Sequence, residues 1–165
     1  MFARVLVALI VLGSAALAAD REDVDFVIAS SLPPEVWEAL TQGNSYAVVS
    51  AINPFYLQGD FDGDGWRDTA VLVKERASGK KGAAIVFKGG KVRIIGAGKD
   101  IGDGTTSLDW MDAWYMERKG KVMQGATDEA PPTMKGDGIM AIKTESASGL
   151  IYWDGKRFRW YQQGG

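Results

Sequence analysis

The chain has 165 residues, a formal charge of −2 at pH 7, 46% hydrophobic residues and 24% charged residues. This composition is typical of a globular protein, and it excludes a disordered tail, a collagen-like fibre and a polytopic membrane protein. The slightly acidic balance argues against nucleic acid as a partner, because phosphate binding requires a basic face. Cysteine and histidine are both absent, which excludes disulfides, thiolate nucleophiles, Ser-His catalysis and imidazole or thiolate metal ligands.

The start of the chain has the pattern of a secretory signal peptide. Residues 5–13 form an apolar run, and Ala16 and Ala18 follow at the −3 and −1 spacing that signal peptidase prefers. The run is too short to span a membrane. We therefore predict a cleaved signal peptide over residues 1–18 and a single periplasmic or secreted domain over residues 19–165, with no membrane span after cleavage. An uncut N-terminal anchor is the alternative.

Two short helices are predicted next. Pro33-Pro34 separates them, and Pro34 suits the first position of the second helix, which is predicted over Glu35–Thr41. Apolar stripes at helical spacing predict that both helices pack on a core. The stripe of the first helix comprises Val24, Val27, Ile28 and Ser31, and that of the second comprises Val36, Ala39 and Leu40.

An acidic segment, residues 60–68, gives the sharpest chemical signal. Its aspartates fall at positions 1, 3, 5 and 9, and glycine at position 6 permits a sharp turn. Calcium binds oxygen ligands in a flexible cage, and short carboxylates at alternate positions of a tight loop can converge on one ion. We predict a Ca²⁺ site whose ligands are Asp60, Asp62, Asp64, the backbone carbonyl of Trp66, and Asp68.

The loop differs from an EF-hand on its C-terminal side. Position 12, where an EF-hand carries a bidentate Glu, is Val71, and it lies in the aliphatic run 69–73. This run is typical of a strand. The loop is therefore predicted to join two strands, Phe55–Gly59 and Thr69–Glu75. A solvated acidic turn is the alternative, but four crowded carboxylates without an ion would repel one another.

Residues 59–71, with the sequence GDFDGDGWRDTAV, resemble the FG-GAP or VCBS-type repeat. The resemblance implies that the four aspartates and the Trp66 carbonyl bind calcium, and it implies no activity. Members of that family stack several repeats into a propeller, whereas the motif occurs once here. A propeller needs at least four blades of about 40 residues, so a full propeller is not expected. The chain is also similar to short exported bacterial proteins of unknown function.

A hairpin is predicted around Gly89-Gly90. Gly-Gly supplies the positive φ angles of a type I′ turn between Ala83–Phe87 and Val92–Ile95. In that register Ile85 lies opposite Ile94.

Residues 109–115, with the sequence DWMDAWY, combine three aromatic and two acidic side chains. On a strand, Trp110, Asp112 and Trp114 would share one face, and aromatic planes beside a carboxylate can hold a sugar. The pair Asp109 and Asp112 also suggests glycoside hydrolysis, which requires two carboxyl groups. An aromatic core strand is the third interpretation.

The C-terminal region predicts a second hairpin, Leu150–Trp153 with Lys156–Tyr161, around Asp154-Gly155. Pairing Trp153 with Lys156 gives this hairpin two different faces. Ile151, Phe158 and Trp160 form a core face, and the opposite face is aromatic and basic, comprising Tyr152, Arg157, Arg159 and Tyr161. Arg beside aromatic residues is typical of interface anchors.

Residues 146–152 and 158–164 are similar to the paired strands of membrane-bound inhibitors of c-type lysozyme. In that family a Ser and a Lys from these strands reach the lysozyme cleft. The Lys is absent near Gln163, and the cysteines of many members are absent too. The resemblance implies inhibition of a secreted hydrolase, such as c-type lysozyme, as an alternative function.

Together these patterns predict an α+β domain, mostly β, with two N-terminal helices packed on an antiparallel β-meander. We predict a structural Ca²⁺ and no catalytic residues. The expected activity is binding of an envelope protein or a glycan; the alternatives are hydrolase inhibition and a carbohydrate-active enzyme that uses Asp109 and Asp112. The candidate binding residues are Tyr152, Arg157, Arg159, Tyr161, Trp110 and Trp114.

Overall fold

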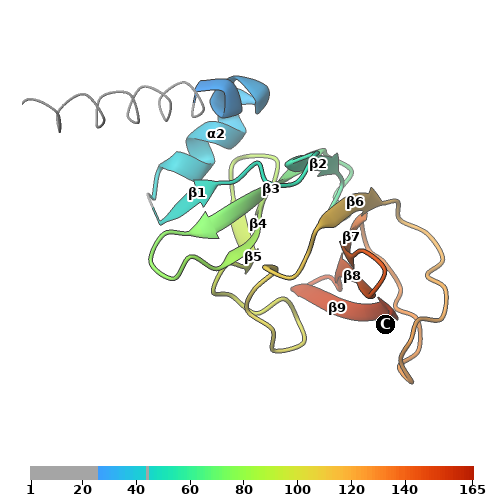
Figure 1. The fold of residues 1–165 in the computed structure, drawn as a ribbon. Helices are drawn as coiled ribbons and strands as arrows, with labels where there is room; N and C mark the ends of the chain where they lie inside the picture. The colour runs from blue at the N-terminus through green and yellow to red at the C-terminus, as the bar shows by residue number, and fades with distance from the viewer. Residues whose placement is uncertain (1–25, 44) are drawn as a thin grey trace, which may run out of the picture.

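The computed structural model describes residues 26–43 and 45–165, and it is mostly β (Figure 1). The predicted signal peptide lies outside the described residues. A helical segment, 26–31, leads to helix α2 (Pro34–Thr41), whose first position is proline as predicted. The missing N–H of proline costs nothing there, because the first amides of a helix have no intrahelical partner. No helix in the described part of the chain has the length and apolar character needed to cross a membrane.

The first sheet has five strands and is antiparallel throughout. The order is β1-β3-β4-β5, and β2 pairs with the same strand β3 as β1 does. The short strands β1 and β2 thus share β3 end to end: β1 pairs with residues 73–75 and β2 with residues 68–71. The bounds are β1 (Tyr46–Val48), β2 (Tyr56–Gly59), β3 (Asp68–Glu75), β4 (Lys81–Val86) and β5 (Val92–Gly96).

The second sheet is a four-stranded meander in which each strand pairs with its neighbour in sequence. Its strands are β6 (Ala113–Glu117), β7 (Gly138–Lys143), β8 (Ala147–Trp153) and β9 (Phe158–Gly164). The predicted antiparallel meander is therefore confirmed, but it is divided into two sheets. Neither sheet is closed into a propeller or a barrel.

Strands β3 and β4 are buried on both faces, which explains their nearly continuous apolar sequences. Ala70 and Leu72 point to one side, where they join a core that includes Ile139 and Ile151 of the second sheet. The alternate residues of β3 point to the other side and pack with the helices. The first sheet is thus the middle layer between the helices and the second sheet (Figure 1).

The apolar stripe of α2 is largely as predicted, whereas that of the preceding helical segment is as predicted only at Ile28. Val36 and Leu40 of α2 are buried, and Ile28 and Leu32 are the buried side chains of the preceding helical segment and its end. Val27 and Ser31 were also expected in this stripe, but both are exposed, and Val24 lies outside the described residues.

The predicted register of the first hairpin is wrong by one residue. Ile85 pairs with Arg93, not with Ile94, which lies opposite Ala84. Gly89 and Gly90 both have positive φ as expected, but the connection is longer than two residues and runs from Phe87 to Lys91. Because β4 is buried on both faces, either register buries apolar side chains, so hydrophobic alternation does not select between them.

The second hairpin is also longer than predicted. Trp153 pairs with Phe158, not with Lys156, so the register shifts by two residues. The side-chain period of a strand is two, and a two-residue shift therefore keeps every side chain on its predicted face. Asp154 explains the longer turn, because its Oδ1 accepts hydrogen bonds from the backbone N–H groups of Lys156 and Arg157, at 2.8 and 2.9 Å.

We predict that the packing of Trp160 over Gly149 limits what this position tolerates. A Cβ on Gly149 would overlap the indole ring of Trp160. Gly149→Ala should lower the free energy of unfolding by about 1–3 kcal/mol, as overpacking typically does. Gly120→Ala is the control, because the nearest atom to a Cβ there is 3.6 Å away, and it should change stability by less than about 0.5 kcal/mol. Urea denaturation measures both, and equal midpoints would contradict the packing described.

Candidate metal site

The acidic loop connects β2 to β3, as predicted. Gly59 pairs with Asp68, so the two ends of the loop are held together by the antiparallel ladder. Residues 60–67 therefore fold into a compact turn at the end of this strand pair.

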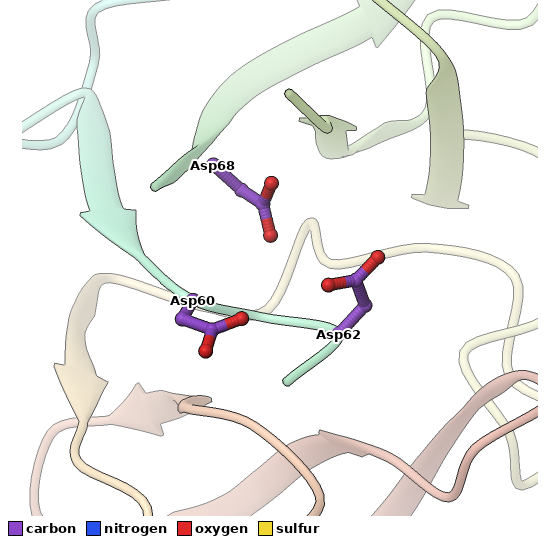
Figure 2. Close-up of side chains that lie close together, drawn as sticks. All are labelled: Asp60, Asp62 and Asp68. Atoms are coloured by element: carbon purple, nitrogen blue, oxygen red, sulfur yellow. The ribbon is translucent and has the colours of Figure 1, made fainter. Parts of the chain in front are cut away.

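Three of the four aspartates converge. Asp60, Asp62 and Asp68 each offer a carboxylate oxygen, and these oxygens lie within 4.8 Å of one another. Figure 2 shows the three carboxylates around a common space. Calcium–oxygen distances are about 2.3–2.6 Å, so one ion can contact two oxygens that lie up to about 5 Å apart. The triad has the spacing of a site that could hold one metal ion.

The fourth predicted carboxylate, that of Asp64, lies outside this triad. Its Oδ1 accepts a hydrogen bond from the backbone N–H of Trp66 at 2.8 Å. The Trp66 side chain is 62% exposed. Metal binding by Asp64 and by the Trp66 carbonyl remains a prediction from the sequence.

Backbone N–H groups of the loop donate hydrogen bonds to Asp60 and Asp62 and so hold these two carboxylates in place. The two carboxylate oxygens of Asp60 accept hydrogen bonds from the N–H groups of Gly63 and Gly65, at 2.8 and 3.0 Å. Asp62 accepts one from Asp64 N–H at 3.2 Å. Gly63 and Gly65 both have positive φ, a conformation that L side chains rarely adopt, and this is why the motif carries glycine there.

Asp68 is the buried member of the site, with 1% of its surface exposed. Its two oxygens accept hydrogen bonds from the backbone N–H groups of Phe61, at 2.9 Å, and Lys88, at 3.1 Å. Desolvation raises the pKa of Asp68 to about 6; the charges of Asp62 and Asp64 add to the increase, and the two amide bonds oppose it. A cation placed between these carboxylates would offset the cost of burying that charge.

The pKa of Asp62 is also raised, mainly by desolvation and further by the neighbouring charges of Asp64 and Asp60. Crowding of like charges therefore acts on two members of the triad. The two ion pairs found among the described residues, Lys143–Asp112 and Arg159–Asp154, lie elsewhere.

The second sheet supports the loop through Asp137. The carboxylate of Asp137 accepts hydrogen bonds from the backbone N–H of Asp60, at 3.0 Å, and from that of Lys119, at 2.9 Å. Its own N–H donates to the carbonyl of Asp60 at 2.6 Å. The sequence reasoning missed Asp137; the only signal was its Gly-Asp-Gly context, which is equally typical of an ordinary turn.

The predicted aromatic-basic face does not form one exposed surface. Tyr161 is 2% exposed and belongs to a small core with Met134, Met140 and Leu150. Its hydroxyl accepts a hydrogen bond from Gly125 N–H at 3.1 Å and donates one to the Glu129 carbonyl at 3.2 Å. The long segment before β7, which the sequence predicted only as a loop, covers this face.

The other candidate binding residues are divided between the two faces of the second sheet. Trp114 is 4% exposed and lies in the core between the sheets, where its Nε1 donates to the Pro54 carbonyl at 2.6 Å. Trp110 packs edge-on against Trp160, with ring centroids 5.8 Å apart. On the opposite face Tyr152 is half-buried, Arg157 is exposed, and Arg159 pairs with Asp154 at 3.0 Å.

The two carboxylates considered for hydrolysis, those of Asp109 and Asp112, each accept hydrogen bonds from neighbouring groups of the fold. Asp109 accepts hydrogen bonds from Lys81 N–H, at 3.2 Å, and from the Ser107 hydroxyl. Asp112 binds the backbone and hydroxyl of Thr144 and the ammonium of Lys143, and these hydrogen bonds lower the pKa of Asp112 to about 2. Both aspartates anchor turns in this structure.

Comparisons of the chain with family models, with curated proteins and with solved structures gave no match. No family is identified, and the two resemblances rest on the quoted residues alone. The acidic triad and the antiparallel sheets are the features that the structure supports.

We predict that Asp68 makes the free energy of unfolding depend on pH. Its pKa is raised to about 6 in the folded protein, against about 3.9 in an unfolded chain. Between these values the folded state binds more protons, so this group lowers the free energy of unfolding as pH rises from about 4 through 6. In a chelator, the urea midpoint of the wild type should fall relative to that of Asp68→Asn between pH 5 and pH 7. Parallel profiles for the two proteins would contradict a raised pKa.

We also predict that the contact between the acidic loop and the segment before β7 contributes to stability. A Cβ on Gly63 would overlap the backbone carbonyl of Lys135, whereas nothing lies within 4 Å of a Cβ on Gly65. Both glycines have positive φ, so each Ala variant carries a similar strain of about 1–2 kcal/mol. Gly63→Ala should destabilise the protein by at least about 1 kcal/mol more than Gly65→Ala in urea denaturation, as expected when backbone must move. Equal losses would show that the loop does not pack against residue 135.

Proposed function

We propose that this chain is an exported domain whose acidic loop binds one Ca²⁺, and that the ion has a structural role. The observation that carries the proposal is the convergence of three carboxylates, one of them buried. Four aspartates in nine residues concentrate negative charge in a compact turn. An ion bound there would turn the mutual repulsion of these groups into attraction.

The donor set favours a hard cation. The available side-chain ligands are carboxylates, and the chain contains no cysteine or histidine, so soft or imidazole-preferring metals are disfavoured. Calcium accepts six to eight oxygens in flexible geometry, whereas magnesium demands a tighter octahedron and retains water. Asp64, the Trp66 carbonyl and water would complete a calcium shell around the triad.

The positions of the ligands support a structural role. Asp60 directly follows β2, Asp68 begins β3, and Asp60 is hydrogen-bonded to Asp137, which directly precedes β7 of the second sheet. An ion held by Asp60 and Asp68 would fix both ends of the loop at the point where it meets the second sheet. Binding of the ion to the folded state alone would therefore stabilise both sheets together.

We further propose that the domain acts as a non-catalytic binding module for an envelope protein or a glycan. Asp109 and Asp112 bind backbone groups, and Asp112 also pairs with Lys143. The lowered pKa of Asp112 does not suit a general acid, and Lys143 and Thr144 already bind its two oxygens, which a base or nucleophile would need free. This supports binding over hydrolysis.

Calcium should raise the thermal stability of the protein. If the loop binds calcium only when folded, a hundredfold excess over Kd adds about 2.7 kcal/mol to the free energy of unfolding. For a domain of this size the melting temperature should rise by roughly 10 °C, at about 4 °C per kcal/mol. Asp60→Ala and Asp68→Ala should abolish the shift, because each removes a charged ligand. Differential scanning calorimetry of protein first shown to be metal-free measures it.

Two controls make this test specific. Magnesium at the same concentration should produce a much smaller shift, because it fits a flexible carboxylate loop poorly. Asp128→Asn removes an exposed acidic charge outside the loop and should retain the full calcium shift. An unchanged melting temperature of the wild type in millimolar calcium at neutral pH would falsify the proposal and leave residues 60–68 as a solvated turn.

A further inference from the structure

A groove of about 510 Å³ lies beside the outer surface of the acidic loop. One wall belongs to β2 and the loop, and the other belongs to the end of β6 and the residues after it. The groove is thus formed where the two sheets meet. The larger side chains that line it include those of Trp66, Arg67, Met116, Arg118 and Lys119, and Asp60 and Asp137 line it as well.

The groove carries three cations that are free to bind an anion. Arg67, Arg118 and Lys119 are exposed, and neither of the two ion pairs found among the described residues involves them. The carboxylate of Asp137 is held by two backbone N–H groups. The side chains of the three cations therefore stay available to a ligand.

Trp66 adds a flat apolar surface to this cationic groove. Its side chain is 62% exposed, and its place in the turn is fixed by the backbone hydrogen bond from its N–H to Asp64. The exposed indole offers a flat apolar face on which a ligand can pack. Trp and Arg are also the residues that most often dominate binding energy.

We propose that this groove binds an acidic oligosaccharide. The C–H face of a sugar ring would lie on the Trp66 indole, and the carboxylates of uronic acid units would meet Arg67, Arg118 and Lys119. The planar guanidinium of arginine matches a carboxylate with two parallel hydrogen bonds. The inference rests on the proposed binding role and names its surface and its class of ligand.

The lining favours a saccharide over an acidic protein segment. Trp66 and Met116 are the only large apolar residues among those that line the groove. The core of a protein–protein interface is mostly apolar. A ligand rich in hydroxyl and carboxylate groups fits a polar groove with a single aromatic platform.

The groove also adjoins the metal site. Asp60 lines the groove and belongs to the carboxylate triad. A cation bound to the triad would offset the negative charge of Asp60 and so reduce its repulsion of an acidic ligand. The acidic oligosaccharide should therefore bind more tightly to the calcium-loaded protein.

The test is isothermal titration of the full chain with hexagalacturonate, in calcium and in chelator. Its methyl ester, which keeps the sugar rings and loses the charges, is the matched neutral probe, and hexaglutamate is the acidic peptide probe. Trp66→Ala and Arg118→Gln should each weaken binding by about tenfold, which corresponds to about 1.4 kcal/mol. Arg93→Ala, which removes an exposed cation of β5 outside the groove, should leave binding unchanged. Comparing variants under one condition cancels calcium binding by the sugar itself.

The outcomes are distinct. Charge-dependent binding that requires Trp66, with unchanged melting temperatures of the variants, supports the proposal. Absence of binding at millimolar hexagalacturonate, equal binding of the methyl ester, equal binding of hexagalacturonate by wild type and Trp66→Ala, or binding of hexaglutamate as tight as that of hexagalacturonate would overturn it. A missing calcium shift in the thermal experiment would remove the proposed metal role separately, because saccharide binding is measured in chelator as well.

Discussion

The burial of the Asp68 carboxylate is the constraint on which the rest of the site depends. This side chain is 1% exposed and lies at the first position of β3. One of its oxygens accepts a hydrogen bond from a backbone N–H of the acidic loop, and the other accepts one from a backbone N–H of the turn after β4. One buried charge therefore fixes the position of two separate connections. Desolvation by this burial is the main cause of the raised pKa of Asp68.

The surrounding fold explains why such a charge can be held in place. Strand β3 is the central strand of the first sheet, paired with β1 and β2 on one side and β4 on the other. Its aliphatic residues are buried on both faces, between the helices and the second sheet. The end of a rigid, fully paired strand is a precise support for a ligand, because its backbone cannot move without disrupting both cores. Asp137 supplies the second support from the other sheet.

Local sequence signals predicted the features that depend on short segments. The proline at the start of α2, the connection from β2 to β3 and the positive φ angles of Gly89 and Gly90 follow from the chemistry of a few neighbouring residues. The convergence of Asp60, Asp62 and Asp68 belongs to the same class, because one tight turn brings these three together.

Features that depend on distant contacts could not be predicted in this way. The register of the β4–β5 hairpin was ambiguous because β4 is buried on both faces. The prediction of an exposed aromatic-basic face was wrong because the segment before β7 covers Tyr161 and supplies its hydrogen-bond partners. Asp137 lies 77 residues from Asp60 in sequence, so no local pattern could link them. Each of these outcomes is set by tertiary packing, which overrides strand periodicity.

Side chains of the acidic segment point in two directions, toward the carboxylate triad and toward the neighbouring groove. Asp60, Asp62 and Asp68 face one another around the common space of Figure 2, whereas Trp66 and Arg67 are exposed and line the neighbouring groove. The turn that brings positions 1, 3 and 9 of the segment together leaves positions 7 and 8 on its outer surface. A change in the loop's conformation would therefore alter the carboxylate triad and the position of the indole and the guanidinium together. If the triad holds an ion and the groove holds a ligand, as proposed, this geometric link through the few residues between Asp64 and Asp68 would couple the two binding events.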